Sequence, residues 1–190
     1  GGATILNHPN FGWAVQAKDM LPVKKLYLFE LYNGHPSVRN FGDPKHPSTE
    51  ELWDNLLTQG MTIYGVGSDD AHHFGQWNSG KSNPGRGWVM VRAKELTSDA
   101  ITNAMTHGDF YASSGVMLKT VVRGPKSIEV EVDEKATAKE LASPILYGRK
   151  VNEGKTGYLI EFIGPKGKII ETSVETKASC PVNLPYLRCK

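Results

Sequence analysis

The stretch MTIYGVGSDDAHH, residues 61–73, decides the fold that we expect for this chain. Its first half, Thr62 to Val66, is apolar and rich in β-branched and aromatic residues, which is typical of a buried strand. The carboxylates and imidazoles that follow directly belong to Asp69, Asp70, His72 and His73. Barrel enzymes place their chemistry where strands end, and carboxylates with imidazoles are ligands that divalent metals prefer. The stretch therefore predicts part of a metallohydrolase site.

Strand-like and helix-like segments alternate from residue 3 to about residue 120. Strands are predicted over 3–7, 25–32, 62–66, 88–93 and 110–113, and helices over 13–21, 49–57 and 100–106. Ser48 and Glu51 have the spacing of a capping box before the second helix. Alternation with connections of this length favours parallel strands joined by right-handed crossovers, and an antiparallel α+β sheet is the alternative.

From about residue 121 the pattern changes to short strands. The stretch IEVEV at 128–132 alternates between apolar and charged residues, as a strand with one buried face does. Further strands are predicted over 158–163, 169–172 and 186–189. Several short strands without strong helices indicate a β-sandwich. We therefore expect two domains, residues 1–120 and residues 121–190.

Composition restricts the classes of function. The net charge is +2 and the Lys and Arg residues are scattered, which argues against a nucleic-acid groove. No apolar run approaches the about 20 residues of a membrane span, and no signal peptide is visible. Because the first residues run directly into a predicted strand, we expect an earlier segment of the protein to precede them.

The two cysteines, Cys180 and Cys189, lie close together in the sequence. They flank a proline-containing stretch that could turn between strands, so a hairpin disulfide is one interpretation if the protein is exported. Two unrelated buried thiols are the simpler interpretation, because a free cysteine packs well as a small apolar residue.

The candidate metal ligands are one carboxylate and two imidazoles. Asp70 and His72 are spaced i, i+2, which places both side chains on one side of an extended chain. His8 also follows a predicted strand, and Pro9 keeps it extended. If the strands are parallel neighbours, the three side chains share one edge of the sheet. The other histidines, in loop or helix-end positions without an assigned role, are His35, His46 and His107.

Glu30 lies inside the apolar stretch KLYLFELY, residues 25–32, where a charge is costly unless it is paired. It either points inward and orients a ligand histidine, or points outward into solvent, and both interpretations stay open. The polar loop over residues 74–87 holds Lys81 and Arg86, which could cover the site and bind an anionic group of a substrate. A solvated loop is the simpler interpretation.

Five stretches form an ordered set of motifs: LNHPNFGW at 6–13, FELYNG at 29–34, GVGSDDAHHF at 65–74, GWVMVRAKEL at 87–96 and GDFYASSG at 108–115. Together they resemble the C-terminal half of a PHP domain, from the polymerase and histidinol phosphatase superfamily of metal-dependent phosphoesterases. The resemblance implies an α/β fold, a distorted (β/α)7 TIM-like barrel with a two- or three-metal centre. The tail resembles the immunoglobulin-like sandwich of some exported bacterial members, which favours export.

By motif, the resemblance implies that His8, Asp70 and His72 are metal ligands and that Asp70 and His72 act in catalysis through the bound metal. The neighbouring side chains would be those of Asn10, Glu30, Asn33, Asp69 and His73. Family members begin with a His-x-His pair, which this chain lacks. An incomplete centre is therefore expected, with the N-terminal half of the barrel on the same gene product or on another chain.

The predicted function is hydrolysis of a small phosphate ester by metal-activated water. Mn, Fe or Zn would suit mixed His and Asp ligands, and a bound ion would lower the pKa of its water to about 7 and polarise the phosphoryl oxygen. The alternatives are a non-catalytic module that binds a carbohydrate or a protein, and a metallohydrolase that acts on a carbon-centred bond. The sequence has no phosphate loop, dinucleotide fingerprint or nucleophile elbow.

Overall fold

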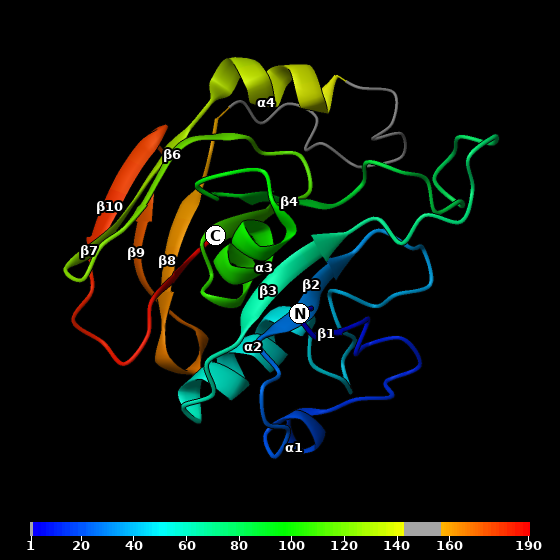
Figure 1. The fold of residues 1–190 in the computed structure, drawn as a ribbon, viewed down its shortest axis with the longest axis horizontal. Coiled ribbons are helices and arrows are strands. Elements are labelled where there is room, and N and C mark those ends of the chain that lie inside the picture. Colours follow the sequence, from blue (N-terminus) through cyan, green and yellow to red (C-terminus); the bar gives the residue numbers. More distant parts are fainter. Residues whose placement is uncertain (1, 143–156) are drawn as a thin grey trace.

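Three strands near the start of the chain form a small parallel sheet (Figure 1). They are β1 (Ile5–Leu6), β2 (Leu28–Asn33) and β3 (Tyr64–Ser68), in the order β1-β2-β3. The computed structural model describes residues 2–142 and 157–190, so Gly1 and residues 143–156 of the predicted domains lie outside the described residues. Because the three strands run the same way, their carboxyl ends meet at one edge of the sheet.

Helix α2 (Thr49–Thr58) connects β2 to β3 and packs on this sheet. The predicted capping box is present: the Glu51 N–H donates to Ser48 Oγ at 3.1 Å, and the Ser48 N–H donates to the Glu51 carboxylate at 2.7 Å. The core beneath the helix consists of Met20, Leu26, Phe29, Leu52, Leu56 and Ile63. Apolar side chains at helical spacing therefore bury one face of α2, as predicted.

Helix α1 (Ala17–Met20) is shorter than the predicted helix over 13–21. Gly12 and Trp13 both have left-handed backbone, with φ of 60° and 57°, which a right-handed helix does not accommodate. The helix begins only after this turn and contributes Met20 to the core.

A second, separate sheet pairs β4 (Trp88–Val91) with β5 (Phe110–Ser113), and α3 (Ser98–Thr106) connects them. The pairing is antiparallel, with Trp88 opposite Ser113. This sheet lies against β3 at Gly67, where an added Cβ would stand 2.9 Å from the Trp88 carbonyl oxygen. The absence of a side chain at Gly67 thus lets the two sheets approach through their backbones.

The prediction of an α/β fold with a TIM-like barrel is wrong. The parallel sheet ends at three strands, β4 and β5 pair antiparallel, and the described residues contain only four short α-helices and no closed barrel. Hydrophobic periodicity specifies an element but not its direction, so a strand–helix–strand pattern fits a parallel crossover or an antiparallel return equally well. At α3 the chain makes the antiparallel return. The fold is a β-rich assembly of small sheets.

The remaining strands form two antiparallel sheets of three strands each. One sheet has the order β10-β7-β6, from β6 (Leu118–Arg123), β7 (Ser127–Val132) and β10 (Lys177–Pro181). The other has the order β11-β8-β9, from β8 (Ile160–Gly164), β9 (Lys168–Ser173) and β11 (Arg188–Cys189). Both sheets contribute to one core, made of Ile128, Val130, Val132, Ile160, Phe162 and Cys180. This is the layering of a small β-sandwich, and β6 spans the predicted boundary at residue 120.

Helix α4 (Glu134–Leu141) follows β7 and was not predicted. Asp133 caps it by accepting a hydrogen bond from the Ala136 N–H at 2.8 Å. A 3₁₀ turn, η2 (Pro165–Gly167), connects β8 to β9. None of the helices within residues 2–142 and 157–190 has the length and apolar character of a membrane span.

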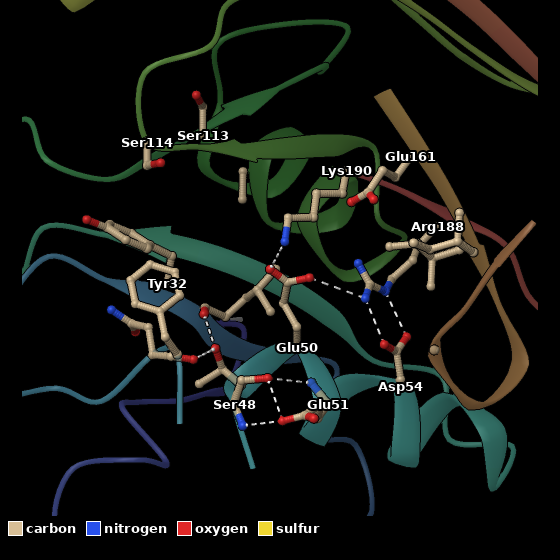
Figure 2. A pocket seen from close by; sticks show the side chains of 18 residues that line it. Tyr32, Ser48, Glu50, Glu51, Asp54, Ser113, Ser114, Glu161, Arg188 and Lys190 are labelled. Carbon is tan, nitrogen blue, oxygen red and sulfur yellow. Dashed lines mark hydrogen bonds and ion pairs between the residues drawn. The ribbon is translucent and has the colours of Figure 1, made fainter. Parts of the chain in front are cut away.

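A buried ion pair joins the N-terminal half, which comprises β1 to β5, to the sandwich, which comprises β6 to β11 (Figure 2). Arg188 of β11 donates from Nε to Asp54 Oδ1 at 2.8 Å and from Nη2 to Asp54 Oδ2 at 2.7 Å. Both side chains are less than a tenth exposed. Burial alone would lower the pKa of Arg188, but the hydrogen bonds and charges of Asp54 and Glu50 raise this pKa above its ordinary value. The guanidinium is therefore charged.

We expect Asp54→Ala to lower the free energy of unfolding by about 3–5 kcal/mol, because Arg188 would stay buried without its carboxylate. Urea unfolding followed by tryptophan fluorescence measures this loss. The control is Lys177→Ala, which removes an exposed ammonium 2.9 Å from Glu129 and should leave the urea midpoint unchanged. Equal shifts in the two variants would contradict the assignment.

Both cysteines are free thiols in the structure, which agrees with the simpler of the two interpretations. Cys180 is buried in the sandwich core, and Cys189 packs against the same core from β11. Burial raises the pKa of Cys189 to about 11, and burial also raises the pKa of Cys180. Both thiols are therefore protonated at neutral pH.

We expect neither thiol of the folded protein to react rapidly with an aromatic disulfide reagent at about pH 8, because the thiolate is the reacting form. Both should react once urea has unfolded the chain, and the absorbance of the released thiol measures the number. A rapid reaction of one thiol before unfolding would show that this part of the core is open to solvent.

Candidate functional site

A group of polar side chains gathers where β2 and β3 end. We call it the polar cluster; its members are His8, Glu30, Asn33, His35, Asp70 and His72. Asn33, only 1% exposed, is the centre of this cluster. Its Nδ2 donates to Glu30 Oε2 at 2.9 Å and to Asp70 Oδ2 at 3.2 Å. Its Oδ1 accepts a hydrogen bond from the His35 N–H at 2.8 Å, so one side-chain amide connects three parts of the edge.

Glu30 is buried, so of the two interpretations of this residue the inward one is correct. Its Oε2 accepts hydrogen bonds from the His8 N–H at 2.6 Å and from Asn33 Nδ2. A shift of register between β2 and β3 falls between Glu30 and Tyr32, and such irregularities redirect side chains near functional sites. Glu30 therefore fixes the backbone of His8, whereas the sequence suggested that it orients an imidazole.

Asp70 and His72 are in direct contact. His72 Nε2 lies 3.2 Å from Asp70 Oδ1, and their side chains are 59% and 29% exposed, respectively. Asp70 has a left-handed backbone with φ of 47°, so the pair does not meet along an extended chain as the i, i+2 spacing had suggested. The ring of His35 meets the ring of His72 edge-on, with the centroids 5.5 Å apart. The pair is thus open to solvent on one side and supported by protein on the other.

His8 lies at the same edge, but it is bonded to Glu30 through its backbone N–H, and its ring contacts Phe11. Its backbone is left-handed with φ of 30°, and its ring lies edge-on to Phe11 at 5.6 Å between centroids. Within residues 2–142 and 157–190, no group of three or more His, Cys, Asp or Glu side chains is arranged to hold a metal ion. The carboxylate and imidazole of Asp70 and His72 are suitable donors for a divalent ion, but two ligands are not a complete set.

The loop over residues 69–87 is folded around two fully buried side chains, Ser82 and Asn83. The Ser82 carbonyl oxygen accepts hydrogen bonds from the N–H groups of His72 and His73, at 3.0 and 2.9 Å. Asn83 Nδ2 donates to the carbonyl oxygen of His73 at 2.8 Å. The loop is therefore held together by internal hydrogen bonds, and these also fix the backbone of His72.

Two further predicted site residues, Asp69 and Arg86, form hydrogen bonds within this loop. Arg86 is 7% exposed, and its Nη2 donates to the Asn78 carbonyl oxygen at 2.6 Å and to Asn83 Oδ1 at 2.8 Å. Asp69 Oδ2 accepts a hydrogen bond from the Gly85 N–H at 2.7 Å. Both charges stabilise the loop, so Arg86 does not present its guanidinium to solvent as an anion-binding group would.

Asn10 connects the turn after β1 to the loop before α2. Its Nδ2 donates to the carbonyl oxygens of Arg39 and Pro47, both at 3.0 Å. Trp13 stacks on His46 with the ring centroids 4.2 Å apart and the planes within 10°. Asn10 therefore positions the turn that carries His8 and stands apart from Asp70 and His72 in its hydrogen bonds.

A cleft of about 670 Å³ lies between the N-terminal half and the sandwich (Figure 2). Its walls come from the start of α2, the ends of β2 and β5, and the strands β8, β9 and β11. Asn40 lines the cleft and also holds the main chain of Asn33, with hydrogen bonds of 3.0 and 2.8 Å. One asparagine thus connects the cleft to the polar cluster.

No family model matches the chain, and neither a curated protein nor a solved structure matches it. The resemblance to PHP domains therefore stays a prediction.

Two residues and the cleft were not predicted from the sequence. His35 was set aside as a loop histidine, although it follows Asn33 by two residues and so falls at the same strand end. No sequence pattern marks Asn40, because its role depends on its hydrogen bonds to the main chain of Asn33. The cleft forms between segments more than 100 residues apart, and no local pattern encodes it.

We expect Asn33→Asp to lower the free energy of unfolding by about 1–3 kcal/mol near neutral pH. The substitution replaces the donor shared by Glu30 and Asp70 with a third carboxylate. Urea unfolding followed by tryptophan fluorescence measures the loss. The control is Asn55→Asp, at an exposed position where the side-chain oxygen only accepts a hydrogen bond from Gln59. A loss of the same size at Asn55 would contradict the role of Asn33.

Proposed function

We propose that the protein is a metal-dependent phosphoesterase that hydrolyses a small phosphate ester at the polar cluster. The observation that carries the proposal is the contact of 3.2 Å between Asp70 and His72 at the carboxyl edge of parallel strands. This pair is exposed to solvent, while Asn33 holds the carboxylate from the buried side. A divalent ion and a substrate can reach this carboxylate and imidazole from solvent, and the protein holds the carboxylate in place from the other side.

Each residue of the cluster has a distinct role in this proposal. Asp70 and His72 would hold part of a site for Mn, Fe or Zn, and His8 is the third candidate ligand. Asn33 keeps one oxygen of Asp70 engaged and leaves the other toward His72. Glu30 holds the backbone that presents His8. A bound ion would supply an activated water and polarise the phosphoryl oxygen.

The described residues bring only two ligands into contact, so further ligands would come from water, from the phosphate itself or from residues outside the described part of the chain. A phosphate ester supplies anionic oxygen ligands that a hard divalent ion favours. The motif resemblance also points to this substrate class. Hydrolysis of a carbon-centred bond has no separate observation in its favour.

The test is a turnover assay on a panel of phosphate mono- and diesters, with Mn²⁺, Fe²⁺ or Zn²⁺ added in turn. We expect metal-dependent release of phosphate or alcohol that a chelator abolishes. Asp70→Ala and His72→Ala should each lower kcat/KM by at least about 100-fold, since partners of metal ligands alone are worth about 10–100-fold.

His107→Ala is the control for this assay. His107 ends α3, its Nδ1 contacts the Asn103 carbonyl oxygen at 2.8 Å, and it is not a member of the polar cluster. This variant should retain full activity. Absence of turnover on every ester with every metal would overturn the phosphoesterase proposal, and so would activity that survives the loss of Asp70.

A further inference from the structure

The proposed chemistry gives no role to one imidazole of the polar cluster, that of His35. This residue comes two positions after the end of β2, and its ring lies edge-on to the ring of His72, with the centroids 5.5 Å apart. His35 is not a third ligand beside Asp70 and His72, because no three such side chains within residues 2–142 and 157–190 are arranged around one ion. Its place beside the pair calls for another explanation.

The position of the proton on the His35 ring follows from one hydrogen bond. The Ser37 N–H donates to His35 Nδ1 at 3.1 Å. A ring nitrogen that accepts a hydrogen bond carries no proton, so the neutral imidazole carries its proton on Nε2. Nε2 lies across the ring from Nδ1 and is turned away from Ser37. His35 is half-buried, and among the described residues no hydrogen bond or ion pair engages its Nε2. The side chain therefore offers one N–H donor that is not yet used.

The main chain holds this donor in a fixed position. The His35 N–H donates to Asn33 Oδ1 at 2.8 Å, and the His35 carbonyl oxygen accepts a hydrogen bond from the Val38 N–H at 3.1 Å. One residue earlier, the Gly34 N–H donates to the Ser68 carbonyl oxygen at 2.8 Å, which attaches the turn to the end of β3. A donor that is already in place needs little further ordering when a ligand binds.

The rest of the polar cluster has few donors to offer an anion. A phosphate ester carries anionic oxygens, which accept hydrogen bonds. The side-chain amide of Asn33 already donates to Glu30 and to Asp70, and the two carboxylates only accept. The other two imidazoles of the cluster are the candidate metal ligands. Arg86, which the sequence suggested as an anion-binding group, donates to main-chain and side-chain oxygens inside its own loop. The Nε2–H group of His35 is the donor that is left for a substrate.

We propose that His35 is a catalytic residue, which donates a hydrogen bond from Nε2 to a phosphoryl oxygen of the ester. The proposal rests on the proposed phosphoesterase function and adds a group that contacts the substrate. The phosphoryl oxygens carry negative charge in the transition state, and a fixed donor aimed at this charge lowers the barrier to hydrolysis. His35 keeps its proton throughout, so this role requires no change in its charge.

The first test locates the ring proton in the metal-free full chain. At about pH 8, where an ordinary imidazole is neutral, nitrogen-15 NMR should find the proton of His35 on Nε2. His107 is the matched control, because its Nδ1 lies 2.8 Å from the Asn103 carbonyl oxygen, an acceptor, and so carries the proton itself. Spectra of His35→Phe and His107→Phe identify the two signals. A proton on Nδ1 of His35 would overturn the proposal.

The second test measures the turnover of phosphate esters and the affinity for Mn²⁺. His35→Phe keeps a ring beside His72 but removes the donor, so kcat should fall by about 100-fold, more than KM rises. His35→Gln, whose side-chain amide can donate, should recover part of kcat. Isothermal titration should find the same affinity for Mn²⁺ in His35→Phe as in the unaltered protein, because His35 is not a ligand. His107→Phe should retain full kcat.

The outcomes separate the role of His35 from the function of the protein. Full kcat in His35→Phe would overturn the role of His35 and leave the phosphoesterase function in place. Loss of Mn²⁺ binding in this variant would overturn the donor role as well, since His35 would then be a ligand. Equal losses of kcat in His35→Gln and His35→Phe would show that the donor is not what matters. Absence of turnover by the unaltered protein would overturn the phosphoesterase function, and the role of His35 with it.

Discussion

The hydrogen bonds of one buried amide, that of Asn33, determine how the edge of the parallel sheet is built. Its side chain donates to Glu30 and Asp70, and its main chain is held from both directions by Asn40. Two carboxylates near each other repel, and a buried one is costly unless it is bonded. A shared neutral donor removes both difficulties. The positions of His8, His35 and His72 follow from this arrangement, because each is bonded to or packed against a residue that the amide fixes.

The second constraint is the ion pair between Arg188 and Asp54. It holds α2 of the N-terminal half against β11 of the sandwich, and the cleft exists because these elements are fixed at that separation. Tyr186 strengthens the contact by donating to Asp54 Oδ1 at 3.3 Å, and Arg188 lies over the ring of Trp53. A buried pair of this kind contributes less to net stability than to a single defined arrangement, because desolvation offsets much of the attraction. Here that arrangement is the relative placement of two otherwise separate cores.

Local features were predictable from the sequence, while directions and long-range contacts were not. The capping box of Ser48 and Glu51 and the alternation of β7 depend on neighbouring residues, and both occur as predicted. The meeting of Asp70 and His72 was also predicted, although the chain was expected to be extended there and Asp70 has a left-handed backbone instead. The barrel was wrong because no pattern in the segment over 88–113 states which way β5 runs. The cleft and the ion pair that bounds it join distant segments, and a single sequence carries no signal for them.

The separation of Arg188 from Asp54 along the chain has a consequence for how the protein forms. The two partners are 134 residues apart, so their contact closes one of the longest loops in the molecule. Contacts of such separation form late, after local helices and hairpins, because the entropy of closing the loop has to be overcome first. During synthesis α2 leaves the ribosome long before β11 does. Until β11 arrives, Asp54 lacks its partner Arg188, and the face of α2 that carries Asp54 is not yet covered by the sandwich.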